Sequence, residues 1–150
     1  MARVLLTGMS GAGKSTLLAE LARRGHHTVD TDYDGWTDGT GGPWDETRMA
    51  ALLATSSHVV VSGTVDNQGC FYDRFDHVVL LSAPVEVLIK RVTGRLDNPY
   101  GRSAADQAEI RRLTVEVEPL LRQTADLELD GREPVDVLAS TVETLLQAPP

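Results

Sequence analysis

The residues at positions 8–16 have the types and the spacing needed to hold phosphate groups. They match the pattern G-x-x-x-x-G-K-[ST] at every required position. Glycines let the backbone approach a ligand closely, so that successive N–H groups and a helix N-terminus point at phosphate oxygens. Lys14 would supply a positive charge to the β- and γ-phosphates, and Ser15 a hydroxyl ligand to Mg²⁺. The pattern predicts a nucleoside triphosphate site formed by Gly8, Met9, Ser10, Gly11, Ala12, Gly13, Lys14, Ser15 and Thr16.

Two carboxylates lie at and just beyond the end of the next predicted strand, residues 27–30. In a doubly wound sheet the carboxyl ends of the strands face the ligand crevice, so Asp30 and Asp32 should both approach the γ-phosphate. We assign Asp30 to a water-mediated Mg²⁺ contact and Asp32 to orienting or deprotonating an acceptor hydroxyl. The alternative interpretation is that both are solvated turn residues, because Asp is common in turns.

A group of arginines lies between two later helical patterns. Arg91 and Arg95 are four residues apart, hence on one helix face, and Arg102 follows in a segment that contains two glycines. We predict a lid at about 93–104 that closes over the nucleotide and neutralises charge on the transferred phosphoryl group. Arg91 and Arg95 would bind the nucleotide, Arg95 would also act in catalysis, and Arg102 would face the acceptor. The alternative is an exposed loop that simply carries arginines.

Strand and helix patterns alternate along the chain and must position these residues. We expect strands at residues 3–7, 27–30, 58–62, 77–82 and 127–130. Helical patterns begin near residues 14, 45, 84, 103 and 134, and Pro119 should disturb the fourth. A breaker-rich loop spans residues 31–44. Five strands with helical crossovers predict a three-layer α/β fold, in one domain over residues 1–150.

Composition narrows the class of partner. The chain of 150 residues has a formal net charge of −8, with 14 Lys and Arg that are mostly dispersed. A protein that grips a nucleic-acid backbone usually has a basic face, so a small acceptor is favoured over DNA or RNA. No apolar run approaches the length of a membrane span, and no secretory signal is visible. A single cysteine fits a reducing compartment, and we expect a cytoplasmic protein, monomeric or homodimeric.

Several motifs that would define other nucleotide-binding classes are absent from the sequence. A guanine-reading Asn-Lys-x-Asp does not occur, and the third predicted strand ends in Ser62-Gly63-Thr64 instead of a Mg²⁺-binding aspartate. The chain is also too short for the helical lid domain of ring-forming ATPases.

Together, the phosphate loop, the Asp-x-Asp after the second strand and the arginine segment resemble P-loop small-molecule kinases of the shikimate kinase and nucleoside-monophosphate kinase group. This resemblance implies a strand order of 2-3-1-4-5, ATP as donor, and an acceptor cleft beside strands two and three. It also implies that Arg132 and Pro134 pack on the adenine. The chain departs from shikimate kinases at Ser62-Gly63-Thr64, where they have three glycines, and it lacks their arginine-proline-leucine run in the lid. These differences argue against assigning shikimate as the acceptor, but they leave the class of reaction unchanged.

The acceptor cleft should be lined by residues from two loops and the arginine segment. Aromatic and amide side chains suit a ring-bearing, hydroxylated acceptor such as a nucleoside, a sugar or an aromatic metabolite. The candidate acceptor-binding residues are Asp32, Trp36, Gly63, Thr64, Asn67, Gln68 and Arg102. Trp36 and Trp44 have an equally good interpretation as core residues under a long loop.

The leading hypothesis is a Mg²⁺–ATP-dependent kinase that phosphorylates a small molecule. An alternative is a nucleotide-dependent regulatory or binding module without a small-molecule acceptor. A kinase acting on nucleic-acid ends shares the chemistry but fits poorly with the negative charge.

Overall fold

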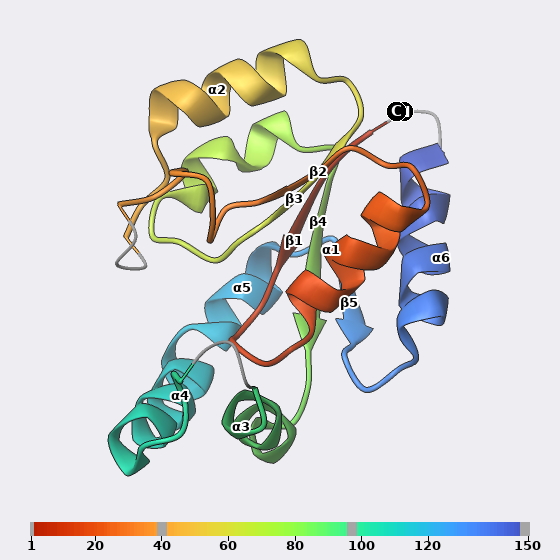
Figure 1. Ribbon diagram of the computed structural model, residues 1–150. Helices are drawn as coiled ribbons and strands as arrows, with labels where there is room; N and C mark the ends of the chain where they lie inside the picture. The colour runs from red at the N-terminus through yellow and green to blue at the C-terminus, as the bar shows by residue number, and fades with distance from the viewer. Residues whose placement is uncertain (1, 39–41, 96–98, 148–150) are drawn as a thin grey trace.

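A parallel five-stranded sheet forms the centre of the molecule (Figure 1). The computed structural model describes residues 2–38, 42–95 and 99–147. The strands are β1 (Arg3–Thr7), β2 (Thr28–Asp30), β3 (Val59–Ser62), β4 (His77–Ser82) and β5 (Leu127–Asp130). Their order is β2-β3-β1-β4-β5, which confirms the predicted order and fold class. Leu5 of the central strand pairs with Val61 on one side and Val78 on the other.

The helices fall close to their predicted positions. They are α1 (Lys14–Arg23), α2 (Glu46–Thr55), α3 (Val85–Thr93), α4 (Ala104–Glu116), α5 (Glu118–Thr124) and α6 (Val135–Gln147). One further element, the 3₁₀ helix η1 (Gln68–Arg74), was not predicted. Across the described ranges, no helix combines the length and the apolar character needed to cross a membrane.

Helices cover both faces of the sheet because successive strand residues point to opposite sides. Val4 and Leu6 face α1 and α6 and belong to one core cluster. Leu5 faces the other way and packs with Met49 of α2 and Phe71 of η1 in a second cluster. Figure 1 shows α2 on one side of the sheet and α1 and α6 on the other. The sheet is therefore buried on both faces, as its continuous apolar strands predict.

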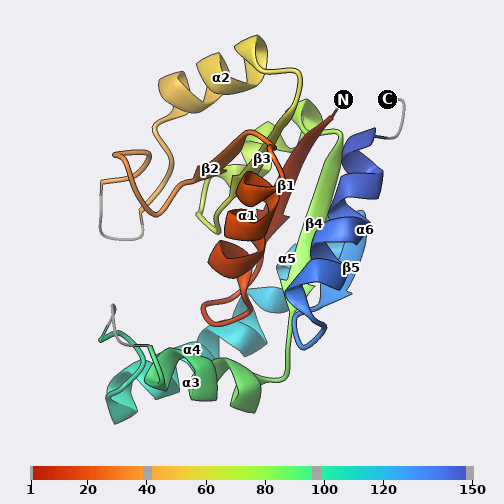
Figure 2. The same cartoon turned by 45° about the vertical axis from the view of Figure 1, so that its right-hand side comes forward.

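Two helices, α3 and α4, lie beyond the carboxyl ends of the strands (Figures 1 and 2). The side chain of Ser103 accepts a hydrogen bond from the Asp106 amide at 3.0 Å and so caps α4. The predicted disturbance near Pro119 is confirmed, since α4 ends at Glu116 and α5 starts with Pro119 in its first turn. This break lets α5 return to contact β4.

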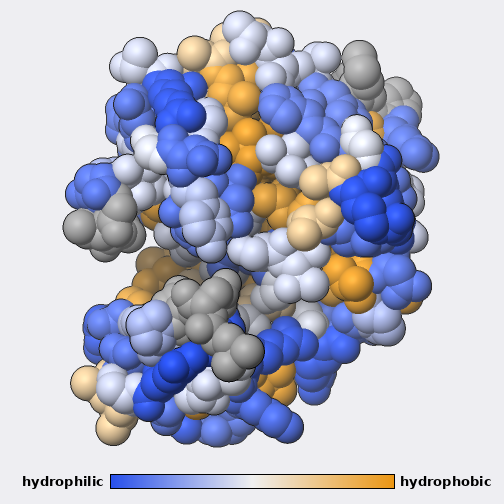
Figure 3. All heavy atoms as spheres, in the orientation of Figure 1, coloured by the Kyte–Doolittle hydropathy of each residue, from blue (hydrophilic) through white to orange (hydrophobic). Residues whose placement is uncertain are grey.

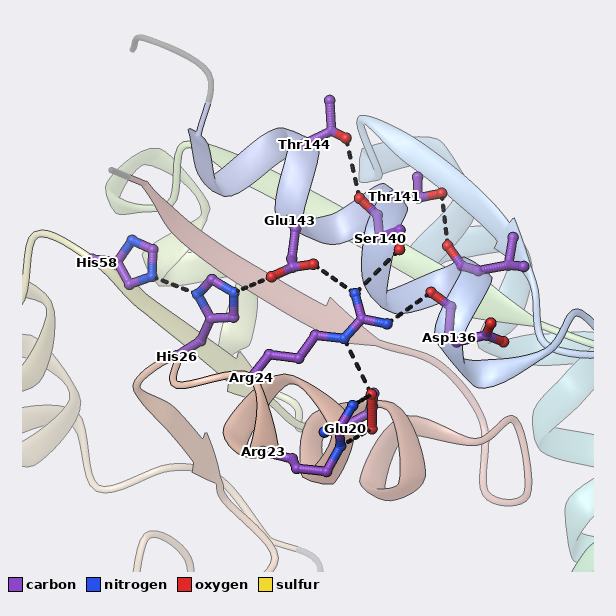
Figure 4. Close-up of polar contacts among 11 residues, drawn as sticks. Glu20, Arg23, Arg24, His26, His58, Asp136, Ser140, Thr141, Glu143 and Thr144 are labelled. Carbon is purple, nitrogen blue, oxygen red and sulfur yellow. Dashed lines mark hydrogen bonds and ion pairs between the residues drawn. The ribbon is translucent and has the colours of Figure 1, made fainter.

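A polar network lies at the opposite end of the strands, near the amino ends of β2 and β3 (Figure 4). His26 Nε2 lies 2.7 Å from the Glu143 carboxylate, and its Nδ1 shares a hydrogen bond of 3.0 Å with His58 Nε2. Arg24 bonds to Glu143 at 2.6 Å and to Glu20 at 3.1 Å. The network joins α1, α6 and the segment before β3, at the end of the strands opposite to the phosphate loop.

Candidate functional site

The phosphate loop runs from the end of β1 to the start of α1 and depends on its glycines. Gly11 and Gly13 have φ values of 86° and 107°, a region that side chains disfavour. A Cβ at Gly8 would lie 2.2 Å from the carbonyl oxygen of Leu81. Gly13 is the N-cap of α1 and provides no side-chain cap. The first amides of the helix are therefore available to an anion, and this cradle fits the phosphates of a nucleotide.

Lys14 folds back over this loop. Its Nζ donates to the carbonyl oxygens of Gly8 at 2.5 Å and Met9 at 3.1 Å. Burial lowers the pKa of Lys14 to about 8, and the nearby carboxylates Asp32 and Asp30 oppose that effect. The side chain lines a cavity of about 730 Å³ beside the loop. In its protonated form, a lysine held in this way can form an ion pair with a bound phosphate.

The two predicted metal ligands are adjacent. Ser15 Oγ donates a hydrogen bond of 3.0 Å to Asp30 Oδ2, and Asp30 Oδ1 accepts one from the Asp32 amide at 3.1 Å. Both are hard oxygen donors of the kind Mg²⁺ prefers. The described residues contain no group of three or more His, Cys, Asp or Glu side chains arranged for a metal. A Mg²⁺ site completed by phosphates and water needs only one or two carboxylates, so these residues fit that ion.

Asp32 lines the same cavity as Lys14. Desolvation raises the pKa of its carboxyl group, and the negative charge of Asp30 adds to this effect. Lys14 and Arg95 act in the opposite direction. A carboxylate with a raised pKa next to a phosphate site is a suitable proton acceptor.

The three arginines have different surroundings. Arg91 donates to the carbonyl oxygens of Gly11, Ala12 and Gly131 at 2.8–3.2 Å and so holds the phosphate loop against the segment after β5. Arg95 lines the large cavity, and its buried Nε has no partner among the described residues. Such an unpaired donor fits an anionic ligand.

Arg102 does not line this cavity, and its Nη2 donates to the carbonyl oxygen of Arg95. Residues 96–98 of the predicted lid lie outside the described residues.

Arg132 does not face the phosphate loop. Its guanidinium group makes a two-point contact with Asp130, with Nη2–Oδ2 at 2.8 Å and Nε–Oδ1 at 3.0 Å, and it lines a separate cavity with Arg122. A small cavity of about 260 Å³ adjoins the loop instead. Its lining includes the two neighbours of Pro134, namely Glu133 and Val135.

Several residues that were predicted to bind the acceptor are instead buried or hydrogen-bonded within the protein. Trp36 and Trp44 are 8% and 2% exposed and pack in the second core cluster. Asn67 exchanges hydrogen bonds of 2.9 and 3.1 Å with the backbone of Trp44. Gln68 is 3% exposed and donates to Thr7 Oγ1 and to the Tyr72 hydroxyl. These contacts favour the core interpretation of the tryptophans.

Gly63 and Thr64 both lie close to neighbouring loops. A Cβ at Gly63 would meet Thr31 Oγ1 at 2.2 Å. The Thr64 hydroxyl donates to the carbonyl oxygen of Gly8 at 2.7 Å and accepts from the Gly8 amide at 3.1 Å. Thr64 thereby fixes the start of the phosphate loop.

The structure adds residues that the sequence did not identify. Lys90 lines the large cavity with Lys14. The Arg48 guanidinium lies 4.0 Å from the centre of the Trp36 ring and donates to the Asp34 carbonyl oxygen. A second cavity of about 510 Å³ involves Met9, η1, α4 and α5. The helical spacing of Leu113, Val117 and Leu121 indicated core positions, and only tertiary packing shows that they also line this cavity.

Known proteins resemble this chain in sequence and in structure. A family described as AAA domain matches residues 4–112. The shikimate kinase of Pseudomonas entomophila is 31% identical, over 100% of this chain and 99% of the relative. That of Neisseria meningitidis serogroup C is 28% identical, over 97% and 94%.

Solved structures of small-molecule kinases share the fold. A shikimate kinase from Acinetobacter baumannii in complex with shikimate has a TM-score of 0.71 at 22% identity, over 97% of this chain and 92% of that one. A deoxyadenosine kinase from M. mycoides, with dCMP and dCDP bound, has a TM-score of 0.61 at 15% identity, over 96% and 97%.

Proposed function

The chain belongs to the AAA-domain family and to the shikimate kinase family, and from this premise we propose a specific role for each residue of the site. The protein is an ATP-dependent kinase that acts on a small-molecule acceptor. One observation carries the assignment of roles: Lys14, Asp32 and Arg95 line one cavity at the phosphate loop, and the charge of Arg95 acts on the pKa values of both Lys14 and Asp32.

On the donor side, the loop amides and Lys14 hold the β- and γ-phosphates, and Arg95 neutralises the charge that develops on the moving phosphoryl group. The unpaired Nε of Arg95 supports this role. Ser15 and Asp30 would hold Mg²⁺, which neutralises charge between the phosphates when it is bound.

On the acceptor side, Asp32 takes the proton of the acceptor hydroxyl. The acceptor oxygen then forms a bond to the γ-phosphorus, and the bond from that phosphorus to the β,γ-bridging oxygen breaks. ADP leaves with the electron pair of that bond. The raised pKa of Asp32 supports its assignment as proton acceptor, because proton transfer is most efficient when the catalytic pKa is near the working pH.

The test is an assay of ADP release with nucleosides, sugars, hydroxy acids and amino alcohols as acceptors. We expect at least one class to raise ADP formation well above slow hydrolysis of ATP. If no class does so, the alternative of a regulatory module without a small-molecule acceptor gains support. Lys14→Ala is the matched control, since the observed turnover should vanish with that charge.

Shikimate is one member of this panel and not the assumed acceptor. This chain has Ser62-Gly63-Thr64 where the resemblance to shikimate kinases implies three glycines. The Thr64 hydroxyl already donates a hydrogen bond to the carbonyl oxygen of Gly8. The lid at 93–104, the cytoplasmic location and the monomeric or homodimeric state stay predictions.

A further inference from the structure

The cavity of about 510 Å³ next to the phosphate loop has a mostly apolar lining that contains one carboxylate. It lies between η1, α5 and the end of α4. Figure 3 shows this side of the molecule hollowed between the part that carries α2 and the part that carries α3 and α4, with apolar surface inside the hollow.

This cavity and the cavity lined by Lys14 are lined by consecutive residues of the phosphate loop, Met9 and Ser10 respectively. The carbonyl oxygen of Met9 accepts a hydrogen bond of 3.1 Å from Lys14 Nζ. Lys14 itself lines the nucleotide cavity. Met9 therefore contacts both the second cavity and the lysine assigned to the phosphates.

Aliphatic side chains from the two helices dominate the lining. Leu113, Val117 and Leu121 come from one side of α4 and α5, and Leu120 at the same site is 59% exposed. A leucine left this exposed gains by burial against an apolar ligand, at roughly 25 cal/mol for each Å² that is covered. The lining thus suits a ligand with an aliphatic or aromatic body.

Asp66 gives the cavity its charge. It is the one charged side chain among the described lining residues, and no arginine, lysine or histidine lies with it. Its carboxylate has no hydrogen-bond or ion-pair partner among the described residues. Tyr72 accepts a hydrogen bond from Gln68 at 2.9 Å, which leaves its own O–H free to donate to a ligand.

We propose that the acceptor is a small amino alcohol with an apolar body, whose protonated amine lies near Asp66 and whose hydroxyl lies toward the phosphate loop. This inference rests on the proposed function, because the cavity is taken as the acceptor half of the kinase site. A carboxylate or phosphate would lose its hydration beside Leu120 and Val117 and would meet Asp66 instead of a cation. The net charge of −8 acts in the same direction at long range.

The test compares three compounds that share one body: phenylalaninol, phenylpropanol and phenyllactate, which are a cation, a neutral alcohol and an anion. Binding is followed by NMR of isotope-labelled methionine methyl groups in the full chain, with the Met9 signal assigned by Met9→Leu. Met49 is fully buried in the other core cluster and serves as an internal reference. We expect the Met9 signal to shift with phenylalaninol at the lowest concentration and with phenyllactate at the highest, while Met49 does not move.

Two variants of equal charge separate the local effect from the long-range one. Asp66→Asn should weaken phenylalaninol binding about fivefold and leave phenylpropanol binding unchanged. Asp73→Asn removes the same charge from η1 at a position outside the cavity lining and should change neither. Val117→Arg, which introduces a cation, should reverse the order of phenylalaninol and phenyllactate.

The outcomes distinguish this inference from the kinase assignment. If phenyllactate binds at least as tightly as phenylalaninol, or if no compound shifts Met9, the inference is wrong even though another acceptor supports ADP release. If phenylalaninol shifts Met9 but no amino alcohol raises ADP release, the cavity binds amines and the proposal that it is the acceptor site fails. Equal losses in Asp66→Asn and Asp73→Asn would also overturn the role of Asp66.

Discussion

Around the phosphate loop, the charges of individual residues depend on one another. Lys14 is desolvated, and Asp32 and Asp30 support its charge, whereas Arg95 opposes it. The same Lys14 and Arg95 oppose the rise in the pKa of Asp32. Removing Asp30 or Arg95 therefore changes the pKa values of both Lys14 and Asp32. This coupling gives two predictions at the scale of the residue.

Asp32→Asn should lower kcat by about two to four orders of magnitude, because a positioned general base contributes an effect of that size. The affinity for ATP should stay nearly unchanged, since Asp32 is assigned to the acceptor and not to the phosphates. Steady-state kinetics and calorimetric titration with ATP measure the two quantities separately. A large loss of ATP affinity would mean that Asp32 belongs to the donor side and that its role and that of Asp30 are exchanged.

ATP binding should weaken at alkaline pH, because Lys14 must be protonated to attract phosphate. Its pKa in the free protein is about 8, so the ammonium form is complete below that value and is lost above it. The Kd for ATP should be about tenfold higher at about pH 9 than at about pH 7. Lys14→Met should bind ATP more weakly and without this pH dependence. A wild-type Kd that is flat over the same range would contradict the assignment.

At the scale of the element, the turn at residues 100–101, which leads into α4, is held by close packing. Gly101 has a φ of 98°, and a Cβ there would lie 2.3 Å from Val92 Cγ2. Its amide donates to Asp106 at 3.0 Å, so the turn is fixed to the first turn of α4. The packing sets where α4 begins, and through it where Leu113 and Val117 meet the second cavity.

Gly101→Ala should therefore destabilise the protein more than Gly25→Ala. Both glycines have positive φ, 98° and 94°, so both variants carry the same backbone cost of about 1–2 kcal/mol. Only Gly101 adds a steric clash, because nothing lies within 4 Å of a Cβ at Gly25. We expect an additional loss of about 1–3 kcal/mol in the free energy of unfolding, measured by urea titration. Equal losses would show that α3 and α4 adjust to the methyl group.

At the scale of the whole molecule, the polar network near the amino ends of the strands links the first helix, α1, to the last, α6 (Figure 4). His58 is stacked on His26 with ring centroids 5.2 Å apart, and its Nδ1 is buried without a partner among the described residues. Desolvation and the nearby His26 lower the pKa of His58 below 6.5. The folded protein therefore favours the neutral ring.

This lowered pKa makes stability depend on pH. As the pH falls through 6.5, the unfolded chain takes up a proton at His58 that the folded protein resists, so the free energy of unfolding decreases until the folded pKa is reached. His58→Gln should show a smaller decrease in Tm between about pH 7.5 and about pH 5.5, because Gln does not titrate. Thermal unfolding at a series of pH values checks this. If the decrease in Tm is as large in His58→Gln as in the wild type, His58 is not its source.

The sequence by itself predicted the fold class, a phosphate loop between the first strand and the first helix, and Asp30 at the carboxyl end of the second strand, and the structure has these elements in these places. These features depend on local rules: glycine spacing, apolar runs that suit buried strands, and the meeting of strand ends at one edge of a parallel sheet. The resemblance to small-molecule kinases added the strand order, and the structure confirmed it. Helix positions followed from periodicity, and the break near Pro119 followed from a single residue type.

The tertiary structure alone decided which side chains are free to meet a ligand. Trp36, Asn67 and Gln68 have the right types for binding, yet they are used to hold loops and core together. Leu113 and Val117 have the periodicity of core residues, yet they line a cavity. The physical reason is that local sequence sets the direction of a side chain along its own element. What that side chain meets depends on how elements distant in the sequence pack against each other.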